Sequence, residues 1–241
     1  MTIPSLRDQR IVIIGGSSGI GYAVAECAVA EGARVVIGSS GAAKVEAAVA
    51  RLGQAASGGV IDVGDEASVA AFFTDLGDFD HLVFTAGDWG SGPGPGPVAQ
   101  MDFAVAQDGL NIRFWGALKV VKHAQPHLAA KGSVTLTDGL FAHRPRKGAP
   151  LTTAVVGAVE HLARGLAADL APIRVNAVCP GVVLTERWAK ASPEMIRQFT
   201  ERQLLPRGAE PFEVAQAYLY LMRGGYTTGQ VIIVDGGAML V

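Results

Sequence analysis

The feature that most constrains the fold is a glycine-rich turn between the first apolar run and the first helical segment. The run RIVII at residues 10–14 leads directly into GGSSGIG at residues 15–21. Gly15 allows a tight turn, Gly19 lets the backbone approach a pyrophosphate, and Gly21 lets the helix pack closely on the sheet. The helix amino terminus would offer N–H groups and a positive dipole to that anion. We therefore predict a dinucleotide phosphate site made of Gly15, Ser17, Ser18, Gly19, Ile20 and Gly21.

Short β-branched runs alternate with longer alanine-rich segments of helical period along the rest of the chain. Nearly continuous apolar runs are typical of parallel strands covered on both faces, and their alternation with helices indicates βαβ crossovers. We expect a Rossmann-type, doubly wound α/β fold with about seven parallel strands, helices on both faces and a single domain over residues 1–241. The expected strands are Arg10–Ile14, Arg34–Ile37, Gly59–Ile61, Leu82–Thr85, Val134–Thr137, Ile173–Val178 and Val231–Val234. The expected helices lie near 19–31, 42–52, 66–76, 99–130 (as two helices), 151–169 and 211–222, with an irregular loop at Gly87–Pro97.

The composition excludes several classes of protein. Apolar residues make up 49 % of the chain and charged residues 17 %, which indicates a large buried core rather than disorder. A net charge of −2 without a basic run argues against nucleic-acid binding, and no apolar run approaches the roughly 18 residues of a membrane span. The polar amino terminus lacks a secretory signal, so we expect a cytoplasmic protein. Cys27 and Cys179 have no metal-like spacing, and we expect neither a metal site nor a disulfide framework.

The end of the second expected strand bears on which nicotinamide dinucleotide would bind. An acidic residue about 20 positions beyond the loop selects NAD through the adenosine ribose. Here residues 37–41 read IGSSG, with no carboxylate to repel a 2′-phosphate and no arginine to bind one. Ser39 and Ser40 favour NADP(H), and a small-residue turn that accepts NAD(H) as well stays open.

Motifs along the whole chain resemble those of the short-chain dehydrogenase/reductase family. Beyond GGSSGIG they are IDV at residues 61–63, DHLVFTAG at 80–87, VNAVCPGVVLT at 175–185 and GQVIIVDGG at 229–237. The resemblance implies an NAD(P)(H)-dependent oxidoreductase that acts on a small carbonyl or alcohol substrate.

The resemblance also implies where the rest of the cofactor would lie. The residues implied for the adenine, the ribose and the nicotinamide are, in that order, Asp62 and Val63, Ala86 and Gly87, and Pro180, Gly181, Val183 and Thr185. From the residues alone, Ala86 and Gly87 are equally consistent with an ordinary turn after a strand. Thr185 is likewise consistent with a simple helix N-cap.

The family's four catalytic residues, Asn, Ser, Tyr and Lys, are all replaced when the segments are aligned without gaps. Gly139 stands at the serine position and Thr152 at the tyrosine position, while Val156 replaces the lysine and Arg113 the asparagine. A threonine hydroxyl is a poor acid at neutral pH, and valine can neither bind a ribose nor tune a pKa. Positioned acid–base groups are worth about 10²–10⁴ in rate, so the usual chemistry of the family is not expected here.

Polar residues that follow the fifth expected strand are candidates to replace the missing acid. Asp138 and His143 are the hypothesised proton donors, because histidine titrates near neutral pH. The alternatives are a turn or cap role for Asp138 and a solvated loop for His143 and Arg144. Arg113 lies on an otherwise apolar helix and would pair with Asp138, or bind an anionic substrate or the cofactor phosphates. Cys179 is expected to be a small buried residue rather than a redox group.

Two functions from different classes stay open. The first is an NADP(H)-dependent oxidoreductase whose proton donor has moved, or whose substrate is activated enough to need little acid help. The second is a nucleotide-binding sensor or partner subunit without turnover, which would explain the loss of all four catalytic positions. We favour the oxidoreductase because holding the nicotinamide end matters mainly for hydride chemistry. The resemblance further implies a homodimer or homotetramer formed through the helices at about 109–130 and 151–169.

Overall fold

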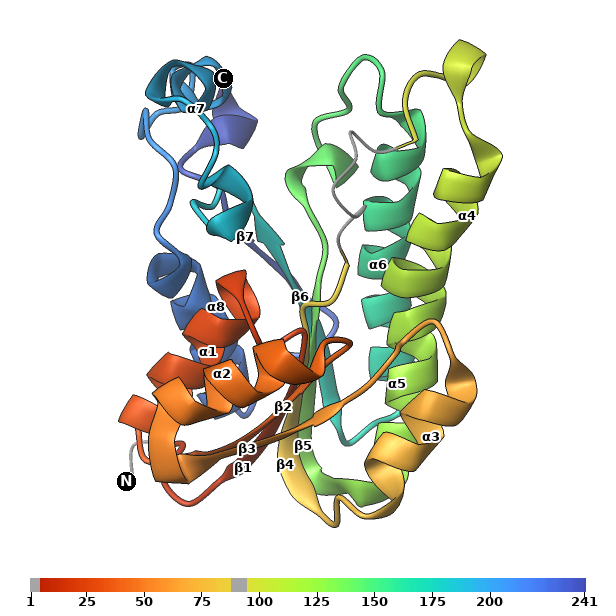
Figure 1. Ribbon diagram of the computed structural model, residues 1–241, viewed down its shortest axis with the longest axis vertical. Helices are drawn as coiled ribbons and strands as arrows, with labels where there is room; N and C mark the ends of the chain where they lie inside the picture. Colours follow the sequence, from red (N-terminus) through yellow and green to blue (C-terminus); the bar gives the residue numbers. More distant parts are fainter. Residues whose placement is uncertain (1–4, 88–94) are drawn as a thin grey trace.

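Seven strands form one parallel sheet in the order β3-β2-β1-β4-β5-β6-β7. The computed structural model describes residues 5–87 and 95–241, and Figure 1 shows the sheet running through the middle of the molecule. Its strands carry β-branched and apolar side chains on both faces, so helices must cover both. The strands are β1 Arg10–Ile14, β2 Arg34–Ser39, β3 Ala56–Val60, β4 Phe79–Phe84, β5 Leu128–Thr137, β6 Arg174–Pro180 and β7 Val231–Val234.

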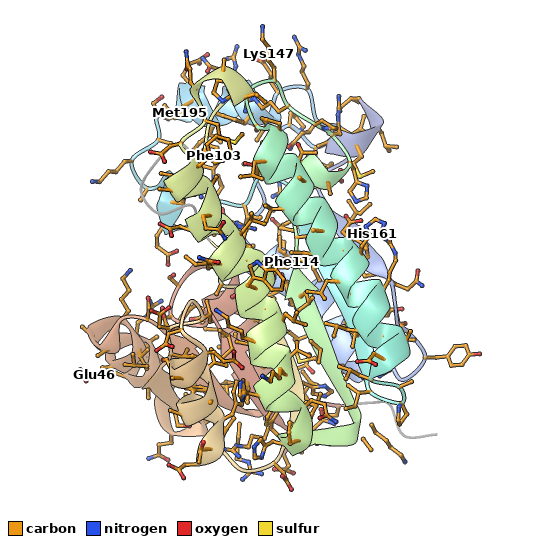
Figure 2. All side chains as sticks on the ribbon, turned by 90° about the vertical axis from the view of Figure 1, so that its right-hand side faces the viewer. Glu46, Phe103, Phe114, Lys147, His161 and Met195 are labelled. Carbon is orange, nitrogen blue, oxygen red and sulfur yellow. The ribbon has the colours of Figure 1, made fainter. Side chains whose placement is uncertain are left out.

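The helices lie in two layers, one on each face of the sheet (Figure 1). Each layer closes its own hydrophobic core against the sheet, one built around α1 and α8 and the other around α5 and α6. One layer holds α1 Gly19–Ala30, α2 Ala42–Leu52 and α8 Pro211–Arg223. The other holds α3 Glu66–Thr74, α4 Phe103–Leu110, α5 Gly116–Ala124 and α6 Pro150–Asp169. Figure 2 looks onto this second layer, where α4 and α5 follow each other end to end and α6 runs beside them. Helix α7, Pro193–Thr200, lies beyond the carboxyl ends of the strands.

The strand order reverses between β1 and β4, which pair in parallel with Ile14 opposite Phe84. In a doubly wound sheet this reversal opens a crevice at the carboxyl ends of the strands, and ligands bind there. The turn after β1 and the end of β4 therefore form the two sides of the expected cofactor crevice.

The predicted fold class and single domain are confirmed, with local corrections. The predicted strand Gly59–Ile61 lies at 56–60, because β3 is an edge strand whose weak β-formers are placed by pairing with β2. The predicted helical stretch 99–130 ends at α5, and β5 already begins at Leu128. A π-helical turn, Asn111–Trp115, joins α4 to α5. Helix α7 was not predicted, and residues 88–94 of the predicted loop Gly87–Pro97 lie outside the described residues.

No helix within the described ranges is both long enough and apolar enough to cross a membrane.

Candidate active site

The phosphate loop is glycine-rich because the end of β4 presses directly against it. Gly15 has a φ of +88°, and a Cβ added there would lie 2.6 Å from Thr85 Oγ1. A Cβ at Gly21 would lie 2.4 Å from the Gly15 carbonyl oxygen. Such distances are shorter than any side chain tolerates, so both positions must be glycine for α1 to begin where it does. The turn is therefore built for the close backbone approach that a pyrophosphate needs.

A carboxylate occupies the position that this turn offers to an anion. The Gly19 backbone N–H donates to Glu186 Oε2 at 2.9 Å. Thr185 lies directly over Gly19, and a Cβ added to Gly19 would be 3.2 Å from Thr185 Cγ2. Ser18 is the N-cap of α1, and its side chain makes no capping hydrogen bond. The N-terminus of α1 thus binds a negative group from the segment that follows β6.

Small hydroxyl side chains and one lysine surround the expected site of the adenosine ribose. Ser17 lies in the turn after β1 and Ser39 is the last residue of β2, and their Oγ atoms are 2.9 Å apart. Ser40 follows on the exposed turn. The stem of Lys44 lies over Gly41, with Cδ 3.5 Å from where a Cβ would be. Sequence analysis missed Lys44, although a cation one turn after an SSG corner is a readable signal for a 2′-phosphate.

The remaining cofactor positions predicted from the resemblance line the same end of the sheet. Asp62 Oδ1 accepts a hydrogen bond from the Gly64 N–H at 2.8 Å, which holds the turn after β3. Val63 is buried beneath Gly116 at the start of α5. Ala86 follows β4, where Thr85 N–H donates to the Ile14 carbonyl. The structure thus places the turns after β1, β3 and β4 along one crevice.

The segment after β6 closes the other side of this crevice. Pro180 ends β6, and Gly181 lies so close to the chain after β7 that a Cβ would be 2.8 Å from Asp235 Cα. Val183 is buried and bridges to Ala209. Thr185 is the N-cap of the short helix Glu186–Trp188, yet its side chain makes no capping hydrogen bond. Its hydroxyl is therefore not consumed by the local turn.

The positions that the resemblance aligns with the family's catalytic residues lie on elements near the ends of β4 and β5. A Cβ at Gly139 would lie 3.6 Å from Val156 Cγ1 on α6, and Thr152 lies one turn earlier on that helix. Arg113 projects from the π-helical turn against Gly87, whose φ is +153° and whose Cβ would lie 2.7 Å from Arg113 Cγ. π-helical turns occur frequently at functional sites. All four aligned positions thus come from elements that border the crevice.

Comparisons with known proteins agree with this geometry over the full chain. A family model described as enoyl-(acyl carrier protein) reductase matches residues 15–239. A short-chain dehydrogenase/reductase of Stachybotrys chlorohalonatus is 35 % identical over 99 % of this chain and 100 % of the relative. The chain belongs to the short-chain dehydrogenase/reductase family.

Solved structures of the family superimpose closely on this chain. The reductase/Diels-Alderase MalC of Malbranchea aurantiaca has a TM-score of 0.88 and 32 % identity, covering 98 % of this chain and 97 % of its own. A small-chain dehydrogenase solved in complex with NADPH has a TM-score of 0.81 and 30 % identity, covering 97 % of this chain and all of its own.

Beneath the crevice of this short-chain dehydrogenase/reductase, two carboxyl groups lie side by side in the interior. Asp138 is 3 % exposed and Glu160, on α6, is 4 % exposed. Burial and the neighbouring Glu160 carboxyl raise the pKa of Asp138 well above its ordinary value. Sequence analysis missed Glu160 because it lies 22 residues beyond Asp138 on another element.

The structure therefore changes the interpretation of the hypothesised proton donors. Asp138 faces Glu160 and Cys179, and the raised pKa is the opposite of what pairing with Arg113 would produce. Its burial also argues against direct contact with a substrate. His143 is not simply a solvated loop residue, because its Nε2 lies 2.5 Å from Glu160 Oε1.

Arg144 is likewise held in place, since its guanidinium donates a hydrogen bond to the Ala238 carbonyl near the carboxyl terminus. One tyrosine, on α8, reaches the end of β5. Tyr218 on α8 is fully buried, with its hydroxyl 2.7 Å from Thr137 Oγ1. Burial raises its pKa above the ordinary value.

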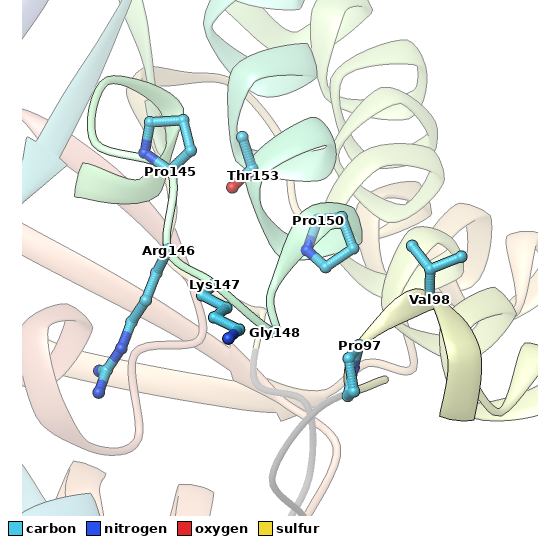
Figure 3. Close-up of a pocket in the computed structure, with 8 residues that line it drawn as sticks. All are labelled: Pro97, Val98, Pro145, Arg146, Lys147, Gly148, Pro150 and Thr153. Carbon is cyan, nitrogen blue, oxygen red and sulfur yellow. The ribbon is translucent and has the colours of Figure 1, made fainter.

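A pocket of about 510 Å³ opens beside the start of α6 (Figure 3). Its walls are the segment after β5, the first turn of α6 and the segment before α4, and it includes the cationic side chains of Arg146 and Lys147. Thr153, next to Thr152, lines its inner wall. A volume in this range suits a small organic ligand. The lining residues are Pro97, Val98, Pro145, Arg146, Lys147, Gly148, Pro150 and Thr153.

Proposed function

We propose that this protein is an NADP(H)-dependent oxidoreductase that reduces a small, polarised carbonyl-type substrate without the family's tyrosine acid. The observation that carries the proposal is the phosphate loop, whose Gly19 N–H already binds the Glu186 carboxylate. Glycines pressed against Thr85 and a helix N-terminus that faces an anion are expected for a dinucleotide site. The structural relative solved with NADPH supports the same class of cofactor.

The ribose corner favours the 2′-phosphate of NADP(H) over the free hydroxyl of NAD(H). Ser17 and Ser39 form a hydroxyl pair there, and Lys44 supplies a positive charge one turn into α2. We expect Lys44→Ala to weaken NADPH binding about two- to fivefold, as for an exposed ion pair, and to leave NADH binding unchanged. Fluorescence titration of both nucleotides measures this, with Lys131→Ala at the opposite end of the sheet as the matched control. Equal loss for both nucleotides would assign Lys44 a role other than 2′-phosphate binding.

The catalytic tetrad of the family is replaced in this proposal by electrostatic stabilisation. When bound, NADPH supplies a hydride to the substrate. Arg113, held against Gly87 at the crevice, would face the negative charge that develops on the substrate oxygen, and water would protonate that oxygen afterwards. A donor placed where charge develops contributes about 10²–10³ in kcat. The Thr152 hydroxyl is placed to orient the substrate, and the buried Asp138 and partly buried His143 take no direct part.

A substrate screen tests the oxidoreductase assignment. NADPH consumption is followed across aldehydes, ketones, quinones and imines for the wild type, for Arg113→Met and for the control Lys122→Met, whose exposed side chain lies on α5. We expect turnover that falls about 10²- to 10³-fold in Arg113→Met only. Tight NADPH binding without turnover on any substrate would instead favour a nucleotide-binding sensor. Unchanged turnover in Arg113→Met would refute the role of the guanidinium.

A further inference from the structure

Four metal-ligating side chains from separate elements converge beneath the crevice. They are Asp138 at the end of β5, His143 in the segment after it, Glu160 on α6 and Cys179 in β6, and we call them the buried ligand cluster. One carboxylate oxygen, imidazole nitrogen or sulfur from each residue lies within 4.8 Å of all the others. The strand register explains part of this convergence, because Thr137 pairs with Val178 and the next residue of each strand follows side by side.

Asp138, Glu160 and Cys179 are buried while His143 is exposed, and three of the buried carboxyl oxygens have no hydrogen-bond partner among the described residues. Asp138 is 3 % exposed, and neither of its carboxylate oxygens has a hydrogen-bond partner among the described residues. Glu160 Oε1 is 2.5 Å from His143 Nε2, yet the two groups are not oriented as donor and acceptor. Cys179 is fully buried beside them. Buried polar groups are otherwise almost always hydrogen-bonded, and each exception calls for an explanation.

The charges of the cluster are also unbalanced. Two carboxyl groups and a thiol face one another, and the basic groups beside them among the described residues are the His143 imidazole, 2.5 Å from Glu160 Oε1, and the half-exposed Arg164 guanidinium, 3.8 Å from Glu160 Oε2. Two buried carboxylates are costly unless a cation or shared proton compensates them. A cation at the centre would satisfy the Asp138 oxygens, neutralise the carboxylates and favour the thiolate form of Cys179.

We propose that Asp138, His143, Glu160 and Cys179 bind one Zn²⁺ ion. A thiolate, an imidazole and two carboxylates are all ligands that zinc accepts, and hard ions such as Mg²⁺ and Ca²⁺ disfavour sulfur. Tetrahedral zinc bonds of about 2.0–2.3 Å would place the ligand atoms about 3.5 Å apart. Small side-chain rotations would bring atoms that now lie within 4.8 Å to that spacing.

Four protein ligands make the proposed site a closed one, which is the hallmark of a structural rather than a catalytic zinc. The ion would tie β5, β6, α6 and the segment that follows Gly139 into one unit beneath the crevice. It would thereby fix the loop that carries the pocket residues Arg146 and Lys147. This inference is independent of the proposed reaction, because the site would stabilise the protein whether or not it turns over.

Metal content and a spectroscopic probe test the site on the tag-free, full-length protein. The chain has two cysteines, so a Cys27→Ser variant retains Cys179 as its sole thiol. After removal of bound metal and addition of Co²⁺, we expect this variant to show a thiolate-to-cobalt charge-transfer band and tetrahedral d–d bands. Zn²⁺ should displace the Co²⁺ at about one equivalent per chain and raise the thermal midpoint.

Variants of the ligands complete the test, with circular dichroism to verify folding. Cys179→Ala and His143→Ala should lose zinc. His161→Ala, on the exposed side of α6 (Figure 2), should retain it. If Cys179→Ala fails to fold, the Cys27→Ser cobalt spectrum and the partly exposed His143 still decide the matter. Absence of thiolate–cobalt bands in Cys27→Ser, or zinc retained in His143→Ala, would overturn the proposal. The two carboxyl groups would then be explained by a shared proton, with nucleotide binding unaffected.

Discussion

Glu186 is the residue whose role in the crevice is the least expected from its sequence context. Its carboxylate accepts a hydrogen bond from the Gly19 N–H, the donor that a cofactor phosphate would use. A pyrophosphate that used this N–H would have to displace the carboxylate. The segment after Thr185 would then compete with the cofactor.

We predict that Glu186→Gln binds NADPH more tightly than the wild type. Interaction of a charge with a helix terminus contributes about 0.3–1 kcal/mol, so its removal corresponds to a dissociation constant about two- to fivefold lower. Fluorescence titration measures the change, and Glu194→Gln on exposed α7 serves as the control for a lost surface charge. Unchanged or weaker NADPH binding by Glu186→Gln would mean that its carboxylate does not compete.

His81 belongs to the sheet rather than to the active site, and it illustrates how a strand holds a buried base. It lies in β4, 3 % exposed, with Nδ1 2.8 Å from Ser133 Oγ and Nε2 2.8 Å from Gln9 Oε1. Burial and the nearby Arg174 lower its pKa from 6.5 to about 3. The imidazole is therefore neutral in the folded protein at physiological pH.

This depressed pKa predicts a specific pH dependence of stability. Between pH 6.5 and about 3 the unfolded chain binds a proton at His81 that the folded protein excludes. The stabilisation present above pH 6.5 is hence lost as the pH falls, at up to about 1.4 kcal/mol per pH unit. The free energy of unfolding, measured with urea at several pH values in this range, should fall less steeply with decreasing pH for His81→Gln than for the wild type or for His161→Gln. Identical slopes for all three proteins would contradict the assignment.

At the level of elements, the sequence predicted the strands and helices that have a clear apolar pattern of their own. Strands β1 and β7 have the bounds expected from their continuous apolar runs. The bounds of β3 differ from the predicted ones because Ala56–Val60 contains weak β-formers, which are held in a strand by pairing with β2. Its glycines fit beneath α2, where a Cβ at Gly58 would lie 2.7 Å from Val45. The π-helical turn between α4 and α5 has no sequence signal of its own.

In the candidate site, residues of one contiguous motif could be predicted from the sequence, and residues that only the fold brings together could not. The phosphate loop is a contiguous motif, and each of its glycines has a local geometric reason to be glycine. The buried ligand cluster was invisible because its members come from four elements, and only the fold brings Asp138 to Glu160 and Cys179. Lys44 lies outside the IGSSG segment at residues 37–41, and only the fold brings its stem over Gly41.

At the scale of the whole molecule, the outer face of α5 and α6 is suited to self-association. Gly157 and Gly165 face open space on α6, since a Cβ at either would meet no atom within 4 Å. Trp115 and Phe103, which extend the same layer, are 47 % and 79 % exposed. Figure 2 shows α6 running beside the rod formed by α4 and α5. We propose that this surface forms the homodimer or homotetramer interface.

Light scattering with size-exclusion chromatography tests the proposed interface. We expect a mass of two or four chains for the wild type, reduced in Gly157→Arg because a long charged side chain would prevent close helix contact. The isolated chain should tolerate this substitution, since Gly157 lies in a helix and faces open space. Gly225→Arg, another open glycine outside these helices, should leave the mass unchanged. A monomeric wild type would exclude the interface.

The most direct test of the proposed dinucleotide site is calorimetric titration of NADPH and NADH into the wild-type protein. We predict one saturable site per chain, tighter for NADPH, and its loss in Gly21→Val, where a side chain would lie 2.4 Å from the Gly15 carbonyl oxygen. Circular dichroism should show that this variant retains the sheet and helices. If neither nucleotide binds the wild type even at millimolar concentrations, the crevice at the β1–α1 turn is not a dinucleotide site and the proposed function fails.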